Sequence, residues 1–251
     1  MHDQILLWLR RVRTFAVSVP LIYLATIFWG TLSLLVSPFD ARGRTQHICA
    51  RWWSRTLLVV CRISVAARGL EHVPRTAPCV FAVNHQSYLD IPVAFGYLPA
   101  NFRIMAKQSL FKIPFLGWHL ARSGHMPIDR HNPRRAARSV LAAAAHVRGG
   151  TPVFVFPEGG RSPDGRFAEF KAGTFLLAIK AGVPVIPVTL NGTRAVMGTS
   201  SWDIHPGRVE LIVHAPISTA GLTSADAEAL AARVRGVMEA DFDLESALAA
   251  G

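Results

Sequence analysis

Three consecutive segments decide the fold class: PVFVF at residues 152–156, AGTFLLAIKA at 172–181 and VPVIPVTL at 183–190. The first and third segments are short apolar runs rich in Val, Ile and Phe, which is typical of buried strands. The segment between them is helix-like. Because a strand, a helix and a strand follow one another, the sequence predicts an α/β fold.

The same alternation continues on both sides of this stretch. The helix at 133–147 has the clearest boundaries, because Asn132 can cap it, Pro133 suits its first turn and Gly149-Gly150 stop it. The other elements that we expect are strands at 79–83, 102–106 and 209–213 and a closing helix at 224–239. A chain of 251 residues is long enough for one sizeable core. We therefore expect a single domain at 67–251, with a central mixed sheet flanked by helices.

Residues 1–66 differ from this domain and predict a membrane-associated helical segment. No charged residue occurs from Thr14 to Phe39, and at 1.5 Å per residue such a helix reaches roughly 30 Å or more, enough to cross a bilayer core. Alternatively, Pro20, Gly30 and Ser37-Pro38 break the run into a hairpin that enters one leaflet. The run is longer than the apolar part of a signal peptide, so we expect the segment to be retained.

The composition points to anionic and apolar surroundings. Hydrophobic residues make up 51% of the chain and charged residues 17%, and the formal net charge is +11; partners consistent with such a charge are nucleic acid, an acidic lipid surface or phosphorylated substrates. Residues 1–65 carry eight arginines and two aspartates between long apolar runs, which indicates a membrane interface. Residues 48–65 fit either an amphipathic helix at that interface or a helix packed on the core.

The three cysteines indicate neither a disulfide framework nor a zinc site. Cys49, Cys61 and Cys79 are odd in number and have no C-x-x-C spacing. We interpret them as small buried apolar residues of a chain in a reducing, cytoplasmic setting.

A histidine and an aspartate follow the strand expected at 79–83. His85 and Asp90 are five residues apart, so a turn at the strand end can bring the carboxylate to one ring nitrogen. Such a pair would let imidazole take a proton from a substrate hydroxyl, with no acyl-enzyme. Taken alone the pair is a weak signal, and a buried histidine in a loop hydrogen bond is the alternative. A metal hydrolase is disfavoured because the chain lacks H-E-x-x-H clustering.

A second loop follows the strand expected at 152–156. Phe156 to Ser162 reads FPEGGRS, which combines small residues that a ligand can approach closely with the guanidinium of Arg161. The loop therefore suits an anionic head group, and a strand-terminating turn with a surface arginine is the alternative.

Four blocks, in order and spacing, resemble the 1-acyl-sn-glycerol-3-phosphate acyltransferases and related glycerolipid acyltransferases. The blocks are NHQSYLD at 84–90, KQSLFKIPFLG at 107–117 leading to Ile128-Asp129-Arg130, FPEGGRS at 156–162 and VPVIPV at 183–188. The chain departs from the family pattern at Gly160, where threonine is usual, and at Pro127, where phenylalanine is usual. The resemblance covers roughly residues 74–191.

The resemblance implies a function and a set of site residues. His85 and Asp90 are implied as the catalytic pair, and the residues implied for substrate binding are Asn84, Ser87, Lys107, Arg130, Glu158, Gly159 and Arg161. We expect Glu158 to orient Arg161 or to meet the glycerol hydroxyls. The implied reaction moves a fatty acyl group from acyl-CoA or acyl carrier protein to the sn-2 hydroxyl of 1-acyl-sn-glycerol-3-phosphate, forming phosphatidic acid.

Further expectations concern partners and location. No metal or cofactor is expected apart from the thioester co-substrate, and the partners are the lysophospholipid, the acyl carrier and membrane lipid, without nucleic acid. The protein is placed at the cytoplasmic face of the inner or plasma membrane. Two alternatives stay open: an acyltransferase for another lysolipid, such as a lyso-aminolipid, and a non-enzymatic basic module that binds membrane or nucleic acid.

Overall fold

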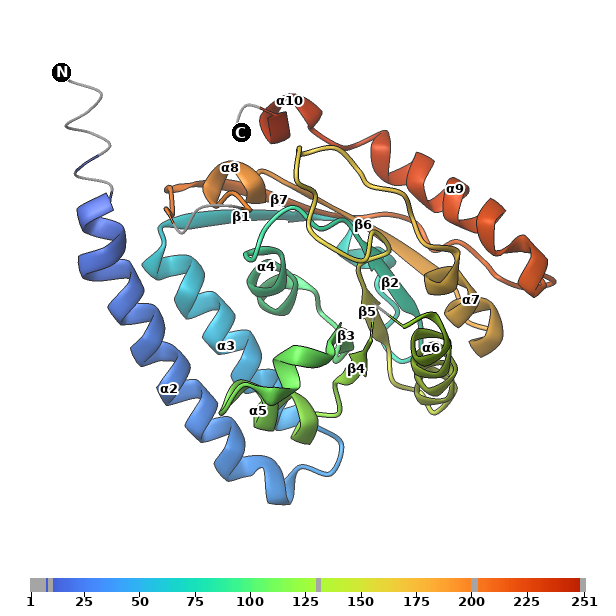
Figure 1. Cartoon of the computed structure of the whole chain (residues 1–251), viewed down its shortest axis with the longest axis horizontal. Helices are drawn as coiled ribbons and strands as arrows, with labels where there is room; N and C mark the ends of the chain where they lie inside the picture. The colour runs from blue at the N-terminus through green and yellow to red at the C-terminus, as the bar shows by residue number, and fades with distance from the viewer. Residues whose placement is uncertain (1–7, 9–10, 130–131, 200–202, 249–251) are drawn as a thin grey trace.

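The computed structural model describes residue 8 and residues 11–129, 132–199 and 203–248. Its centre is a seven-stranded sheet in the order β1-β7-β6-β2-β5-β3-β4 (Figure 1). The strands are β1 Ile63–Arg68, β2 Val80–Val83, β3 Arg103–Lys107, β4 Met126–Ile128, β5 Val153–Val155, β6 Val185–Asn191 and β7 Gly207–Val213. All neighbouring pairs are parallel except β6 and β7, which are antiparallel. The expectation of a mixed sheet is therefore confirmed.

Helices cover both faces of the sheet. They are α2 Val19–Val36, α3 Arg44–Val60, α4 Asp90–Tyr97, α5 Leu116–Arg122, α6 Pro133–Arg148, α7 Ala172–Ala181, α8 Thr193–Val196, α9 Ala227–Glu239 and α10 Leu244–Leu248. In β2, Phe81 and Val83 pack into a core with α3, α4 and α5, whereas Val80 and Ala82 pack into a second core with α6, α7 and α9. Because both faces are covered, the central strands read as continuous apolar runs.

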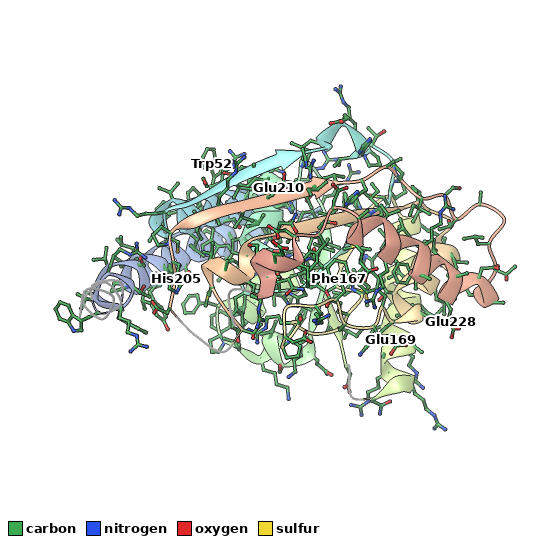
Figure 2. All side chains as sticks on the ribbon, turned by 90° about the horizontal axis from the view of Figure 1, so that it is seen from above. Trp52, Phe167, Glu169, His205, Glu210 and Glu228 are labelled. Atoms are coloured by element: carbon green, nitrogen blue, oxygen red, sulfur yellow. The ribbon has the colours of Figure 1, made fainter. Side chains whose placement is uncertain are left out.

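Most of the predicted elements are confirmed to within a few residues. Helix α7 has the predicted bounds, and α6 ends one residue later than predicted. Two strands were not predicted. Strand β4 Met126–Ile128 is one of them. The other is β1, because the helix expected at 48–65 ends at Val60 and Ile63–Arg68 forms a strand. The proposed boundary between 66 and 67 thus falls inside a strand. Beside β1 lies β7, which carries Glu210 (Figure 2).

The apolar N-terminal run forms one uninterrupted helical stretch from Arg11 to Phe39. By length and composition it is the one helix among the described residues that is long and apolar enough to cross a membrane. The breaks expected at Pro20 and Gly30 are wrong, whereas Ser37-Pro38 does mark the end of the α-helix, because α2 ends at Val36 and a 3₁₀ turn, Ser37–Phe39, follows. Pro20 directly follows the π-helical turn Thr14–Ser18, so the helical hydrogen-bond pattern changes where the proline lacks an N–H group. A glycine in a helix weakens the helix without breaking it.

Helix α3 returns along α2 and joins it to the domain. Trp29 Nε1 donates to Thr56 Oγ1 at 3.3 Å, and Trp53 Nε1 donates to Thr26 Oγ1 at 3.0 Å. The opposite side of α3 is buried in the first core through Ala50 and Leu58. The interpretation of α3 as a helix packed on the core is therefore confirmed for this side.

Candidate active site

The loop after β2 brings His85 and Asp90 together. His85 Nδ1 donates to Asp90 Oδ2 at 2.7 Å, and the same oxygen accepts the backbone N–H groups of Gln86 at 2.7 Å and Ser87 at 2.8 Å. Asp90 is completely buried at the first turn of α4, where the helix dipole favours a carboxylate. Because Asp90 fixes the proton on Nδ1, Nε2 is the nitrogen left to act as a base.

The imidazole ring of His85 is held from one side by Phe156. The two rings are stacked, with centroids 3.8 Å apart and an interplanar angle of 11°. The backbone carbonyl of His85 also accepts the N–H of Ser162 at 2.8 Å. These contacts join the loop after β2 to the loop after β5, and they leave the histidine side chain 14% exposed.

Asn84 and Ser87, which were predicted to bind substrate, are buried, and both side chains bond backbone groups. Asn84 Oδ1 accepts the N–H of Leu190 at 2.7 Å, and Asn84 Nδ2 donates to the Leu190 carbonyl at 2.9 Å. Ser87 Oγ donates to the Met197 carbonyl at 2.7 Å. Both side chains thus use their polar groups to fix the histidine loop against β6 and the segment after α8.

Glu158 connects the two loops as well. Its Oε1 accepts the N–H of His85 at 2.7 Å, and its Oε2 accepts the N–H of Ala168 at 3.0 Å. Both oxygens thus hold backbone groups, and the contact expected with Arg161 or with the glycerol hydroxyls stays a prediction. Burial raises the pKa of Glu158 to about 7, although these two N–H groups act in the opposite direction.

This pKa predicts a pH-dependent contribution to stability. Between the ordinary glutamate pKa and pH 7, folded Glu158 keeps a proton that the unfolded chain has lost, so stability falls as the pH rises. We expect the wild type to lose about 2–3 kcal/mol relative to Glu158→Gln between pH 4.5 and 7.5. Chemical denaturation of both proteins across this range measures the difference. A difference that stays constant with pH contradicts the raised pKa.

Gly159 has a left-handed backbone, with φ of +74°. A Cβ atom at this position would lie 2.8 Å from Nζ of Lys171. Glycine therefore allows the lysine side chain to pack directly against the backbone of the loop. Lys171 was not predicted as part of the site. It belongs to no motif, and the fold alone brings it to Gly159.

Arg161 lies beside the histidine loop, as a site for an anion requires. Its guanidinium carbon is 3.6 Å from the centroid of the Tyr88 ring, and Nη1 donates to the Thr199 carbonyl at 3.4 Å. An aromatic face and a carbonyl hold the guanidinium in place, and none of the ion pairs among the described residues involves it. Arg161 can therefore receive a phosphate.

Two further cations, Lys107 and Arg130, were predicted to bind the phosphate. Lys107 is exposed at the end of β3. Arg130 lies outside the described residues. Because β2, β5 and β3 are parallel neighbours, the ends that carry His85, Glu158 and Lys107 meet at the same edge of the sheet, the usual location of sites in open α/β sheets.

Comparisons with known proteins agree with this geometry. The family model described as Acyltransferase matches residues 64–191. The chain is 38% identical over 178 residues to the chloroplastic 1-acyl-sn-glycerol-3-phosphate acyltransferase BAT2 of Brassica napus, covering 70% of this chain and 51% of that protein. It is 32% identical over 210 residues to the 1-acyl-sn-glycerol-3-phosphate acyltransferase of Pseudomonas aeruginosa, covering 79% of each.

A solved structure shares the fold over nearly the whole chain. The 1-acyl-sn-glycerophosphate (LPA) acyltransferase PlsC from Thermotoga maritima superposes with a TM-score of 0.78 at 29% identity, covering 92% of this chain and 95% of that one. The chain spans only 51% and 56% of the length of two plant relatives that it matches. On the family match and these identities, the chain belongs to the acyltransferase family that contains the 1-acyl-sn-glycerol-3-phosphate acyltransferases.

Proposed function

We propose that the protein transfers a fatty acyl group from a thioester to the sn-2 hydroxyl of 1-acyl-sn-glycerol-3-phosphate, forming phosphatidic acid. The observation that carries the proposal is the His85–Asp90 pair at 2.7 Å, joined by Glu158 to the loop that bears Arg161. A base for a hydroxyl and a cation for a phosphate thus stand on adjoining loops. The names of the relatives support the same reaction.

In the proposed reaction, Nε2 of His85 acts as the general base. Nε2 takes the proton of the sn-2 hydroxyl while its oxygen attacks the thioester carbonyl, and Asp90 stabilises the imidazolium. The new C–O bond forms as the C–S bond breaks, and the imidazolium returns the proton to the departing thiolate. General-base help of this kind typically contributes roughly 10²- to 10⁴-fold, and holding both substrates in place contributes further.

The cations at the sheet edge where β2, β5 and β3 end are proposed to bind the phosphate of the acceptor. Arg161 can fork onto two phosphate oxygens, and Lys107 and Arg130 stay as predicted partners. Glycine at 159 and 160 allows the backbone to approach the head group closely.

Replacing Arg161 with alanine tests the acceptor site. We expect the KM for lysophosphatidate to rise about tenfold with little change in kcat, if the guanidinium holds phosphate equally in ground and transition states. Initial rates at varied lysophosphatidate concentrations measure this. Arg166→Ala, an exposed arginine five residues further along, is the matched control. An unchanged KM for Arg161→Ala removes this residue from the phosphate site.

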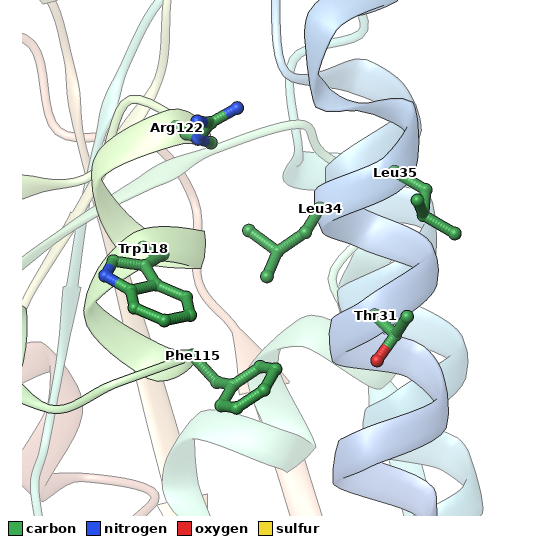
Figure 3. Close-up of a pocket in the computed structure, with 6 residues that line it drawn as sticks. All are labelled: Thr31, Leu34, Leu35, Phe115, Trp118 and Arg122. Carbon is green, nitrogen blue, oxygen red and sulfur yellow. The ribbon is translucent and has the colours of Figure 1, made fainter.

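A membrane location is proposed from the α2 side of the molecule. A groove of about 300 Å³ separates α2 from α5, and Figure 3 shows the residues that line it: Thr31, Leu34, Leu35, Phe115, Trp118 and Arg122. Trp118 and Phe115 are each more than half exposed, as aromatic side chains at a lipid interface often are. We place this side at the cytoplasmic face of the inner or plasma membrane, and flotation with anionic vesicles tests the contact.

The function is tested by acyl transfer from labelled palmitoyl-CoA and palmitoyl acyl carrier protein to lysophosphatidate. A panel of other lysolipids, including a lyso-aminolipid, runs alongside. Transfer to lysophosphatidate supports the proposal. Transfer to another lysolipid alone keeps the chemistry and changes the acceptor, and transfer to none of them by folded protein rejects the proposed function.

A further inference from the structure

The basic charge of the protein is concentrated in one part of the chain beyond the N-terminal segment. Residues 91–157 contain nine lysines and arginines but only one acidic residue, Asp129, whereas 11 of the 16 acidic residues lie after Phe156. This part of the chain supplies β3, β4, β5, α5 and α6. Four of the nine cations, Arg134, Arg135, Arg138 and Arg148, belong to α6, so a partner of this helix is expected to be anionic.

Helix α6 presents a continuous exposed stripe within this region. Arg134, Arg138, Leu141, Ala145 and Arg148 are all exposed and are spaced by four, three, four and three residues, so they share one face of the helix. The opposite face, which includes Val140, Ala143, Ala144 and Val147, is buried in the second core. The stripe is cationic at both ends and apolar in the middle, where Leu141 is 55% exposed.

The dimensions of the stripe suit a helix of another protein better than a small anion. From Arg134 to Arg148 it extends over about 21 Å, whereas a single phosphate group would engage one or two of its cations. An exposed leucine between basic residues also matches a protein interface, in which an apolar centre is surrounded by charge. Beside the stripe, Arg138 lines a groove of about 440 Å³ between α6 and β4.

The position of α6 connects the stripe to the active site. Helix α6 follows β4, which is parallel to β3, β5 and β2, so the N-terminal end of α6 lies at the edge where those strands end. His85 follows β2 at this same edge. A partner that docks along α6 thus reaches the catalytic edge of the sheet at the N-terminal end of the helix, near Arg134.

The membrane is the rival occupant, and the fold disfavours it. Helix α2 packs on the side of α3 and α5, on the sheet face opposite to α6, α7 and α9. Figure 1 accordingly shows α2 and α6 on opposite sides of the molecule. A bilayer that receives the apolar side of α2 is therefore turned away from the stripe.

We propose that the stripe on α6 is the docking surface for an acidic acyl carrier protein that brings the fatty acyl thioester to His85. This inference rests on the proposed acyl transfer and adds the partner that supplies the donor. Acidic side chains of the carrier meet Arg134, Arg138 and Arg148, and an apolar side chain of the carrier covers Leu141. Arg135 is not counted among the contacts, because its Nη1 pairs with Asp129 at 3.4 Å.

The first experiment reverses the charge of the stripe in the full chain purified in detergent. For Arg134→Glu/Arg138→Glu we expect the KM for a bacterial palmitoyl acyl carrier protein to rise at least about tenfold. The kcat with saturating palmitoyl-CoA and the KM for palmitoyl-CoA stay as in the wild type. Arg208→Glu/Arg233→Glu, which changes two exposed arginines on β7 and α9, is the control of equal charge and should leave both donors unaffected.

A second variant separates docking from long-range attraction. Leu141→Gln keeps the charge and the helix propensity of α6 but removes the apolar contact, so we expect weaker binding of the carrier by a few-fold with an unchanged salt dependence. Fluorescence anisotropy of a labelled carrier protein measures this binding without any turnover.

The outcomes distinguish this inference from the proposed function. Equal losses with both donors, or no loss with the carrier protein, overturn the docking surface. Reduced binding to anionic vesicles, with the carrier unaffected, assigns the stripe to the membrane and also overturns it. If the wild type uses palmitoyl-CoA but neither uses nor binds the carrier, the proposed function stands and this inference falls. If no thioester is used but the carrier binds through α6, the docking surface stands and the proposed function falls.

Discussion

His85→Ala is expected to lower kcat by roughly 10²- to 10⁴-fold, because the variant loses the only base placed to take the hydroxyl proton in the proposed mechanism. The fold should survive, since the backbone bonds of His85 to Glu158 and Ser162 do not need the imidazole side chain. Initial rates with palmitoyl-CoA and lysophosphatidate measure the effect.

The control for this prediction is His205→Ala, a histidine on the loop before β7 (Figure 2). It should keep wild-type turnover, and both variants should bind vesicles as the wild type does. Turnover by His85→Ala at the wild-type rate, with the protein pure and folded, would exclude His85 as the base.

Asp90→Asn is expected to cause a loss of similar size by a different route. The carboxylate accepts the proton of His85 Nδ1, whereas an asparagine amide can donate to Nδ1 and so shift the ring proton to Nε2. With Nε2 protonated, the ring cannot accept the hydroxyl proton. We expect kcat to fall roughly 10²- to 10⁴-fold with the KM for lysophosphatidate unchanged.

Asp90 also accepts the N–H groups of Gln86 and Ser87, so loop stability must be separated from chemistry. Thermal unfolding of the variant reports the structural part. Nitrogen-15 NMR of the histidine ring reports the tautomer, which should change from the Nδ1–H form to the Nε2–H form. Retention of the Nδ1–H tautomer together with full activity contradicts the assigned role of Asp90.

The sequence allowed the central strands and the catalytic pair to be predicted, for physical reasons that are local. Strands such as β2 and β6 are apolar on both faces, and a turn after a strand brings residues five apart together. Strand β1 was missed because its sequence, ISVAAR, has no long apolar run and was read as the end of the preceding helix. The order of the sheet depends on pairs far apart in sequence, such as Ile63 with Gly207, and no local pattern reports them.

In the active site, too, local motifs were predicted and contacts between distant residues were not. Motif residues such as Glu158 and Asn84 were predicted to be there, yet their partners, the N–H groups of Ala168 and Leu190, were not. Backbone groups carry no signature in a sequence. For the same reason the sequence did not predict that the Asn84 amide is completely buried and bonds β6.

The pairing of β1 with β7 has a consequence for biosynthesis. Strand β1 cannot pair until β7 has been synthesised, because the partner of Ile63 is Gly207, 144 positions later in the chain. At about 5–20 residues per second, a ribosome needs roughly 7–30 s to make that length. Throughout this interval the nascent chain exposes the apolar side of α2 and an unpaired strand edge, both hazards for aggregation. The N-terminal helices therefore emerge in need of lipid or a chaperone well before the catalytic domain can close.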